Sequence, residues 1–119
     1  MDFSEVVKFC ESKGSRLATL SEYCQDGHVQ GGKQSGDKWA PFSGDGDNAW
    51  VQVGTRSGDH GTCKLHHNHA GNPGGRPAWG KDGRSHGYKS QSVLCVPTSE
   101  TQKASAGLAL FRVGRCHVI

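Results

Sequence analysis

The feature that most constrains this chain is a set of five cysteines in a short, glycine-rich sequence with little apolar content. The 119 residues fit a single domain. Only 33% of them are apolar and 18 are glycine, so the core is small and each ordered glycine costs backbone entropy. Small domains with weak cores depend on cross-links or metals, so we expect disulfides. The five are Cys10, Cys24, Cys63, Cys95 and Cys116.

The odd cysteine count leaves at least one thiol free or paired with another chain. Reduced thiols and a cysteine-bound metal are the alternatives to disulfides. The absence of any CxxC pair argues against a zinc ribbon. If the cysteines are oxidised, the protein is extracytoplasmic: secreted, on the cell surface or in an organelle lumen. No signal peptide is visible, so we expect the targeting segment to be absent from this sequence.

The charge and hydropathy patterns argue against nucleic-acid binding and against a transmembrane segment. Fourteen basic and eleven acidic residues are interspersed and give a net charge of +3. No basic run is present, so we expect no nucleic-acid binding. No stretch approaches the roughly 18–20 apolar residues that a transmembrane segment needs.

Two short helices are predicted near the N-terminus. Residues 2–13 place an apolar stripe at helical intervals, and Asp2 and Glu5 have capping-box spacing. Gly14 suits a left-handed C-terminal cap. Thr19 and Glu22 repeat the capping-box spacing and predict a second helix that runs through Cys24 and ends at Asp26-Gly27.

The remainder reads as strands separated by long loops. Residues 50–53, Trp-Val-Gln-Val, and residues 92–96 are strand-like, and Pro97 stops the second of these. Residues 27–48 and 55–90 are rich in glycine and polar residues and predict loops, with short strands near Cys63 and Trp79. These elements predict an α+β fold with a small, mostly antiparallel sheet.

Several segments resemble the C-type-lectin-like fold. Residues 9–22, which contain Cys10, Gly14-Ser15-Arg16-Leu17 and Glu22, look like the opening of that fold. The same stretch resembles part of the formylglycine-generating-enzyme superfamily, a distant relative. Residues 50–54 look like the central Trp-Ile-Gly strand of the C-type-lectin-like fold, and residues 93–95 look like the closing strand of that fold.

A closer resemblance is to an uncharacterised lectin-like domain of diatoms and other algae. It extends over about residues 3–96 and rests on four segments in a fixed order. These are Trp39-Ala40-Pro41, Asn48-Ala49-Trp50-Val51-Gln52-Val53-Gly54, Cys63-Lys64-Leu65-His66 and Pro77-Ala78-Trp79-Gly80. The resemblance implies that Cys10 pairs with Cys95, which leaves Cys24 to pair with Cys63.

Two candidate metal sites follow from the residue types. Asp45, Asp47 and Asn48 supply three oxygen-bearing side chains for calcium, whereas calcium takes six to eight oxygens, so a hydrated turn is the alternative. His66, His67 and His69 are candidate ligands for zinc or copper, with a polar loop as the alternative. We expect no resident cofactor unless one of these sites holds its metal.

The favoured function is a non-catalytic binding module whose long loops contact a protein or glycan partner. The predicted contact residues are Trp39, Asp45, Asp47, Asn48 and Trp79, although the tryptophans also suit a small core. The alternatives are a structural, extrinsic subunit of a large algal assembly, for example a photosynthetic membrane complex, and a small copper- or zinc-dependent oxidase-like enzyme.

The domain is predicted to occupy residues 1–97 and to be followed by a C-terminal tail, residues 98–119. The tail carries six large apolar residues: Leu108, Leu110, Phe111, Val113, Val118 and Ile119. Because their exposure favours association, we expect the tail to pack on its own domain or to dock on a partner, with Cys116 unpaired within the chain.

Overall fold

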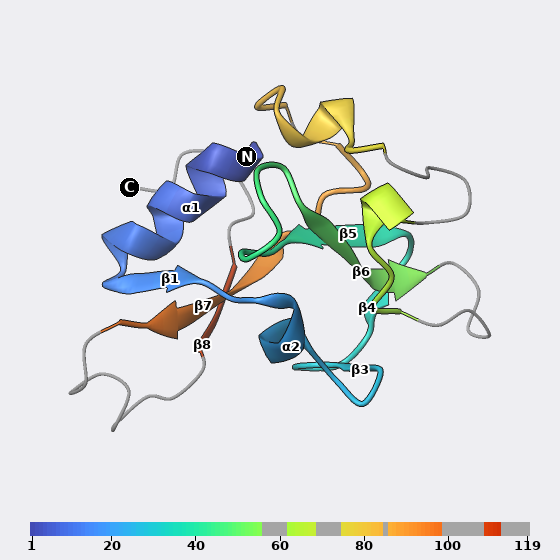
Figure 1. Ribbon diagram of the computed structural model, residues 1–119, viewed down its shortest axis with the longest axis horizontal. Helices are drawn as coiled ribbons and strands as arrows, with labels where there is room; N and C mark the ends of the chain where they lie inside the picture. The colour runs from blue at the N-terminus through green and yellow to red at the C-terminus, as the bar shows by residue number, and fades with distance from the viewer. Residues whose placement is uncertain (56–61, 69–74, 85, 99–108, 113–119) are drawn as a thin grey trace.

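The chain adopts a small α+β fold with two helices and three small sheets in the part that is described (Figure 1). The computed structural model describes residues 1–55, 62–68, 75–84, 86–98 and 109–112. The elements are α1 (Phe3–Ser12), β1 (Ser15–Leu17), α2 (Leu20–Tyr23), β2 (Cys24–Gln25), β3 (His28–Val29), β4 (Gln34–Ser35), β5 (Lys38–Pro41), β6 (Trp50–Thr55), η1 (His66–Asn68), η2 (Ala78–Gly80), β7 (Ser92–Pro97) and β8 (Ala109–Arg112).

Helix α1 begins and ends where its capping residues predict. Asp2 accepts a hydrogen bond from the Glu5 amide at 2.8 Å, and Glu5 accepts one from the Asp2 amide at 2.8 Å. Gly14 follows the helix with a φ of 69°, a left-handed conformation that glycine adopts without strain. The apolar stripe of the helix is buried against the core. Neither this helix nor any other described one is long and apolar enough to cross a membrane.

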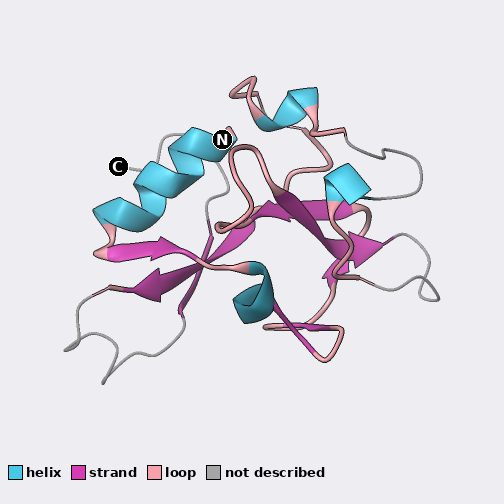
Figure 2. Ribbon diagram, viewed as in Figure 1, coloured by secondary structure: helices cyan, strands magenta, loops and turns pink. Residues whose placement is uncertain are grey.

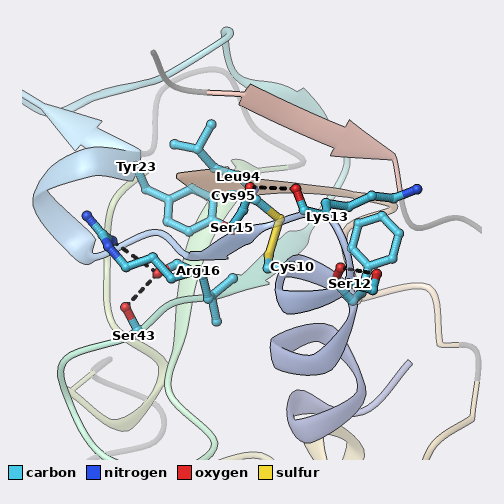
Figure 3. Close-up of a disulfide and its surroundings, with 11 residues drawn as sticks. Cys10, Ser12, Lys13, Ser15, Arg16, Tyr23, Ser43, Leu94 and Cys95 are labelled. Atoms are coloured by element: carbon cyan, nitrogen blue, oxygen red, sulfur yellow. Dashed lines mark hydrogen bonds between the residues drawn. A yellow bond between two sulfur atoms is a disulfide. The ribbon is translucent and has the colours of Figure 1, made fainter. Parts of the chain in front are cut away.

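The first sheet has the strand order β1-β7-β8, with both pairings antiparallel. A disulfide between Cys10 of α1 and Cys95 of β7 fastens the helix to this sheet (Figure 3). Both cysteines are fully buried. The Tyr23 hydroxyl accepts a hydrogen bond from the Leu94 amide at 2.9 Å, and burial raises the pKa of Tyr23 far above its usual value.

The second sheet has the order β4-β6-β5, with β4 parallel to β6 and β5 antiparallel to it. Every residue of β6 is buried, because the strand is central and is covered on both faces. A Cβ at Gly54 would lie 2.6 Å from the carbonyl oxygens of Gln34 and Gly36, so the close approach of β4 requires glycine there. The strand-like residues 50–53 of the sequence are thus part of a longer strand that is buried throughout.

Several local predictions differ from the structure. Residues 27–48, which were expected to be loop, contain β3, β4 and β5. Helix α2 ends at Tyr23, and Cys24 begins the β2–β3 hairpin, which turns through Asp26 and Gly27. These two residues have φ values of 55° and 77°, the left-handed pair that a tight two-residue hairpin needs, so Asp26-Gly27 turns a hairpin rather than ending a helix. The expected strands near Cys63 and Trp79 are the 3₁₀ turns η1 and η2. Figure 2 shows η1 and η2 as short helical turns with described loop segments beside them.

A second disulfide joins Cys24 in β2 to Cys63, which precedes η1. Both observed pairings are those that the resemblance implies. In the chain-entropy account, a loop of 85 residues closed by Cys10–Cys95 contributes about 4.6 kcal/mol, and one of 39 closed by Cys24–Cys63 about 3.9 kcal/mol. Each value is of the order of the whole stability of a small domain.

The described part of the tail packs within its own chain. Residues 109–112 form β8, which pairs antiparallel with β7 so that Ala109 lies opposite Cys95 and Arg112 opposite Ser92. Thr98 donates from its amide to the carbonyl oxygen of Gly14 at 3.1 Å. The rest of the tail, including Cys116, lies outside the described residues.

Candidate functional site

The predicted histidine cluster begins on η1, in the long loop region between β6 and β7. His66 Nδ1 lies 3.1 Å from the carbonyl oxygen of Gly75, and its ring packs edge-on against Trp39 and Trp79, with centroids 5.0 and 5.5 Å away. His67 Nε2 lies 2.9 Å from Asp45 Oδ2. His66 therefore contributes to an aromatic cluster, and His67 fixes a neighbouring loop.

Only part of the predicted zinc or copper site can be placed. His69 lies outside the described residues. Cys63 is in a disulfide and offers no thiolate, and the described segments contain no group of three His, Cys, Asp or Glu side chains arranged to hold a metal. His67 Nδ1 is buried and has no hydrogen-bond partner in the described part of the chain.

The two carboxylates of the predicted calcium site form ion pairs that tie their loop to the segment before and after η2. Asp45 Oδ1 lies 3.8 Å from Arg76, whose guanidinium also donates to the Asp47 carbonyl oxygen at 2.9 Å. Asp47 pairs with Lys81, and the hydrogen bond from that ammonium lowers the pKa of Asp47. Both carboxylates thus have cationic partners within the chain.

Two of the five predicted contact residues are buried. Trp39 is 5% exposed and its indole Nε1 donates to Asp37 Oδ1 at 3.1 Å. Asn48 is 6% exposed; its Oδ1 accepts from Trp50 Nε1 at 2.6 Å and its Nδ2 donates to the Pro77 carbonyl oxygen at 2.8 Å. The accessible part of the predicted surface therefore reduces to Asp45, Asp47 and the half-buried Trp79.

The structure contains an open hollow of about 460 Å³ that was not predicted from the sequence. It lies between the β4–β5 connection and the loop before β7. Its lining consists of Ser35, Gly36, Asp37, Lys38, Gly87 and Tyr88. Tyr88 is 43% exposed, and no other large hydrophobic residue in the described segments up to Thr98 is exposed. An isolated tyrosine beside glycine in a polar loop was the available signal, whereas the aromatic residues among the predicted contact residues are tryptophans.

The buried Lys89 stabilises the loop that carries Tyr88 through the contacts of its ammonium group. The Lys89 ammonium donates to the Arg84 carbonyl oxygen at 2.6 Å and lies 3.2 Å from Asp82 Oδ1. The Arg84 amide, His86 and Lys89 all hydrogen-bond to Asp82 and lower its pKa well below the usual range. This hydrogen-bonded turn fixes the position of Gly87 and Tyr88.

These features define a small, disulfide-bonded α+β domain that carries a solvent-open hollow on its loops. Residues 1–97 match a family described as a domain of unknown function, DUF7495, and the chain belongs to that family. No curated protein and no solved structure matches the chain.

Proposed function

We propose that this chain is a non-catalytic binding module whose loops hold a protein or glycan partner at the hollow beside Tyr88. The observation that carries the proposal is the combination of an open hollow of about 460 Å³ with an exposed aromatic ring in its wall. This volume falls within the roughly 300–1,000 Å³ of ligand sites, and aromatic anchors are enriched where proteins bind partners.

The walls of the hollow are held rigidly with respect to each other, which favours binding because little conformational freedom is left to lose. Lys38 Nζ donates to the Gly87 carbonyl oxygen at 2.7 Å, and the Trp39 amide donates to the Tyr88 carbonyl oxygen at 2.7 Å. The Ser90 amide donates to the Trp39 carbonyl oxygen at 2.8 Å. These three hydrogen bonds join β5 to the loop that forms the opposite wall of the hollow.

Within this proposal the domain is C-type-lectin-like and extracytoplasmic. The link from the first helix to β7 through Cys10–Cys95 and the long loops between β6 and β7 support the first assignment. Two disulfides in a chain with a small core support the second, because such bridges persist in oxidising compartments.

The test is a chemical-shift titration of the isotopically labelled chain with defined proteins and glycans. A binding module shifts the amide resonances of residues 35–38 and 87–88 in a saturable manner and leaves those of α1 in place. The ligand should be recovered chemically unchanged by mass spectrometry after prolonged incubation. Shifts confined to α1, or conversion of the ligand, would contradict the proposal.

A metal-dependent oxidase makes a different prediction that can be checked on the same preparation. It requires stoichiometric copper or zinc in protein purified without added metal, and loss of that metal in His66→Ala and His67→Ala variants. Stoichiometric metal together with oxidation of a bound ligand would replace the binding function with the enzymatic one.

A further inference from the structure

We propose that the hollow beside Tyr88 binds a neutral sugar ring without the help of a metal ion. The inference rests on the proposed binding function and names its ligand class. Its evidence is the chemistry of the groups that line the hollow, all of which lie in described segments.

The aromatic wall offers a supported ring face. Tyr88 is 43% exposed, and its ring lies 6.1 Å from that of Trp79 with an interplanar angle of 35°. The face of an aromatic ring carries partial negative charge and attracts polarised C–H groups such as those on one face of a pyranose. A tyrosine also has only two side-chain torsions to fix, so it presents this face at low entropic cost.

The polar wall supplies both hydrogen-bond donors and acceptors. Ser35 offers a hydroxyl, Asp37 a carboxylate and Lys38 an ammonium. Asp37 Oδ1 accepts hydrogen bonds from Trp39 Nε1 at 3.1 Å and Gln52 Nε2 at 3.0 Å, so the carboxylate is oriented before any ligand arrives. Sugar hydroxyls both donate and accept, which matches this mixed wall.

The charge balance favours a neutral ligand over an ionic one. One carboxylate, Asp37, and one ammonium, Lys38, line the same hollow. A cation attracted to Asp37 and to the ring of Tyr88 also meets the Lys38 ammonium, and an anion attracted to Lys38 also meets Asp37. Juxtaposed like charges discriminate against such partners, whereas a neutral polyhydroxylated ring meets no like charge.

The same lining predicts independence from calcium. Calcium takes six to eight oxygen ligands, and the hollow supplies one carboxylate, which already accepts two hydrogen bonds through Oδ1. Recognition therefore rests on the ring face and on direct hydrogen bonds. Binding should be unchanged by a chelator.

Two substitutions change the hollow in opposite ways. Tyr88→Ala removes the ring face, whereas Tyr88→Phe retains it and loses only the hydroxyl. At Gly87 an added Cβ meets nothing within 4 Å, so Gly87→Leu adds bulk to a lining residue whose Cβ position is open. Lys8, exposed on α1, provides the control substitution Lys8→Gln.

The experiment is calorimetric titration of the full chain with neutral tetrasaccharides of glucose, mannose, galactose and xylose. Oligogalacturonate and a chitosan tetramer serve as the anionic and cationic counterparts. We expect at least one neutral tetrasaccharide to bind, with an affinity unchanged by EDTA and higher than that of both charged sugars. Tyr88→Ala and Gly87→Leu should weaken binding about tenfold or more, whereas Tyr88→Phe and Lys8→Gln should stay within about twofold. Thermal melts of all variants verify that they are folded.

Each other outcome overturns the inference in a distinguishable way. If no neutral tetrasaccharide binds, the sugar assignment is wrong. If a sugar binds equally well to Tyr88→Ala and Gly87→Leu, the location is wrong. If a protein shifts the amides of residues 35–38 and 87–88 while all sugars fail, the binding function survives and its ligand class changes. If nothing shifts these residues, both proposals fail.

Discussion

Asn48 accepts a hydrogen bond from the indole of Trp50 at 2.6 Å, and both residues are almost completely buried. The Asn48 amide nitrogen also donates to the Pro77 carbonyl oxygen at 2.8 Å. One side chain therefore joins the start of β6 to the residue that precedes η2, which carries Trp79. Asn48 has a φ of 57°, a left-handed conformation that asparagine adopts more readily than most residues.

Replacing Asn48 with alanine should destabilise the domain strongly. Asn48→Ala leaves the buried Trp50 N–H without its acceptor, a loss of about 1–3 kcal/mol for one such group. It also removes one of two hydrogen bonds to the Pro77 carbonyl oxygen, which keeps the bond from the Gly80 amide at 3.1 Å. The left-handed backbone at this position adds to the loss. Urea unfolding followed by tryptophan fluorescence measures the change. The neighbouring control Asp47→Ala removes the exposed ion pair with Lys81 and the hydrogen bond from the Asn48 amide to the exposed Asp47 carboxylate, and it should shift the midpoint less. Equal effects of the two substitutions would contradict the assignment.

Gly80 is predicted to tolerate no side chain. A Cβ at this position would lie 2.0 Å from Asn48 Oδ1 and 2.4 Å from Trp50 Nε1, so it must displace the buried hydrogen bond between them. Gly80→Ala should therefore lower the melting temperature and alter the tryptophan fluorescence of the folded state. Gly87→Ala is the matched control, because a Cβ there meets open space. A Gly80→Ala variant that melts with the wild type would show that η2 is held in another way.

The sequence predicts the parts of this fold that are governed by local chemistry. Capping boxes at Asp2 and Thr19 and the turn at Gly14 locate both helices, because each signal acts over a few residues. Strand β5 (Lys38–Pro41) was expected to be loop, since it is defined by its pairing with β6 and not by its own composition. The burial of Asn48 depends on its contact with Pro77, 29 residues away, and sequence spacing alone does not predict this contact.

The same distinction explains the candidate site. Asp45 and Asp47 were predicted together as metal ligands or contact residues, whereas their cationic partners, Arg76 and Lys81, come from another loop. The hollow is made by Asp37 and Tyr88 from separate segments, which only the folded chain brings together. Residue type suggested candidate contact residues, and tertiary contacts decide which of them are accessible.

Stability should fall at acidic pH through the Arg16–Glu22 pair. Two hydrogen bonds from Arg16, each 2.8 Å, are the main cause that lowers the pKa of Glu22 to about 2, with further help from Thr19. Because the carboxyl of the unfolded chain has its ordinary pKa of about 4.3, the unfolded state binds a proton first as the pH falls. The contribution of Glu22 is therefore complete above about pH 4.5 and is lost progressively towards pH 2.

Urea midpoints between pH 6 and 2 in the wild type, Glu22→Gln and Arg16→Gln isolate this contribution. Both variants should lose stability at neutral pH and show a shallower decline below pH 4.5, since neither retains a carboxylate held by Arg16. Other carboxylates with lowered pKa values, such as Asp82, decline equally in all three proteins and cancel in the comparison. Parallel pH profiles would mean that the pair contributes nothing to folding.

The two disulfides should differ in their resistance to reduction. Cys10 and Cys95 are fully buried between α1 and β7, whereas Cys24 and Cys63 are half-buried and Cys63 has a left-handed φ of 72°. A thiolate must reach a sulfur atom to exchange with it, so limiting dithiothreitol should open Cys24–Cys63 first. Alkylation and peptide mass spectrometry at intervals follow the order. Simultaneous opening of both bridges, or earlier opening of Cys10–Cys95, would contradict the argument from burial.

Selective reduction of the Cys24–Cys63 disulfide should also alter the hollow beside Tyr88. The Cys63 amide donates to the Gln52 carbonyl oxygen at 2.7 Å, and the Gln52 side chain donates to Asp37 Oδ1 at 3.0 Å. Loss of the Cys24–Cys63 bridge frees the segment that holds β6 at Gln52, and Asp37 then loses part of its fixed orientation. A Cys24→Ser/Cys63→Ser variant should stay folded through Cys10–Cys95, with a lower melting temperature. Its amide resonances should shift at Asp37 and Lys38 more than along α1, because the connection runs through β6 and not through the first sheet; shifts centred on α1 would show that the bridge supports a different part of the fold.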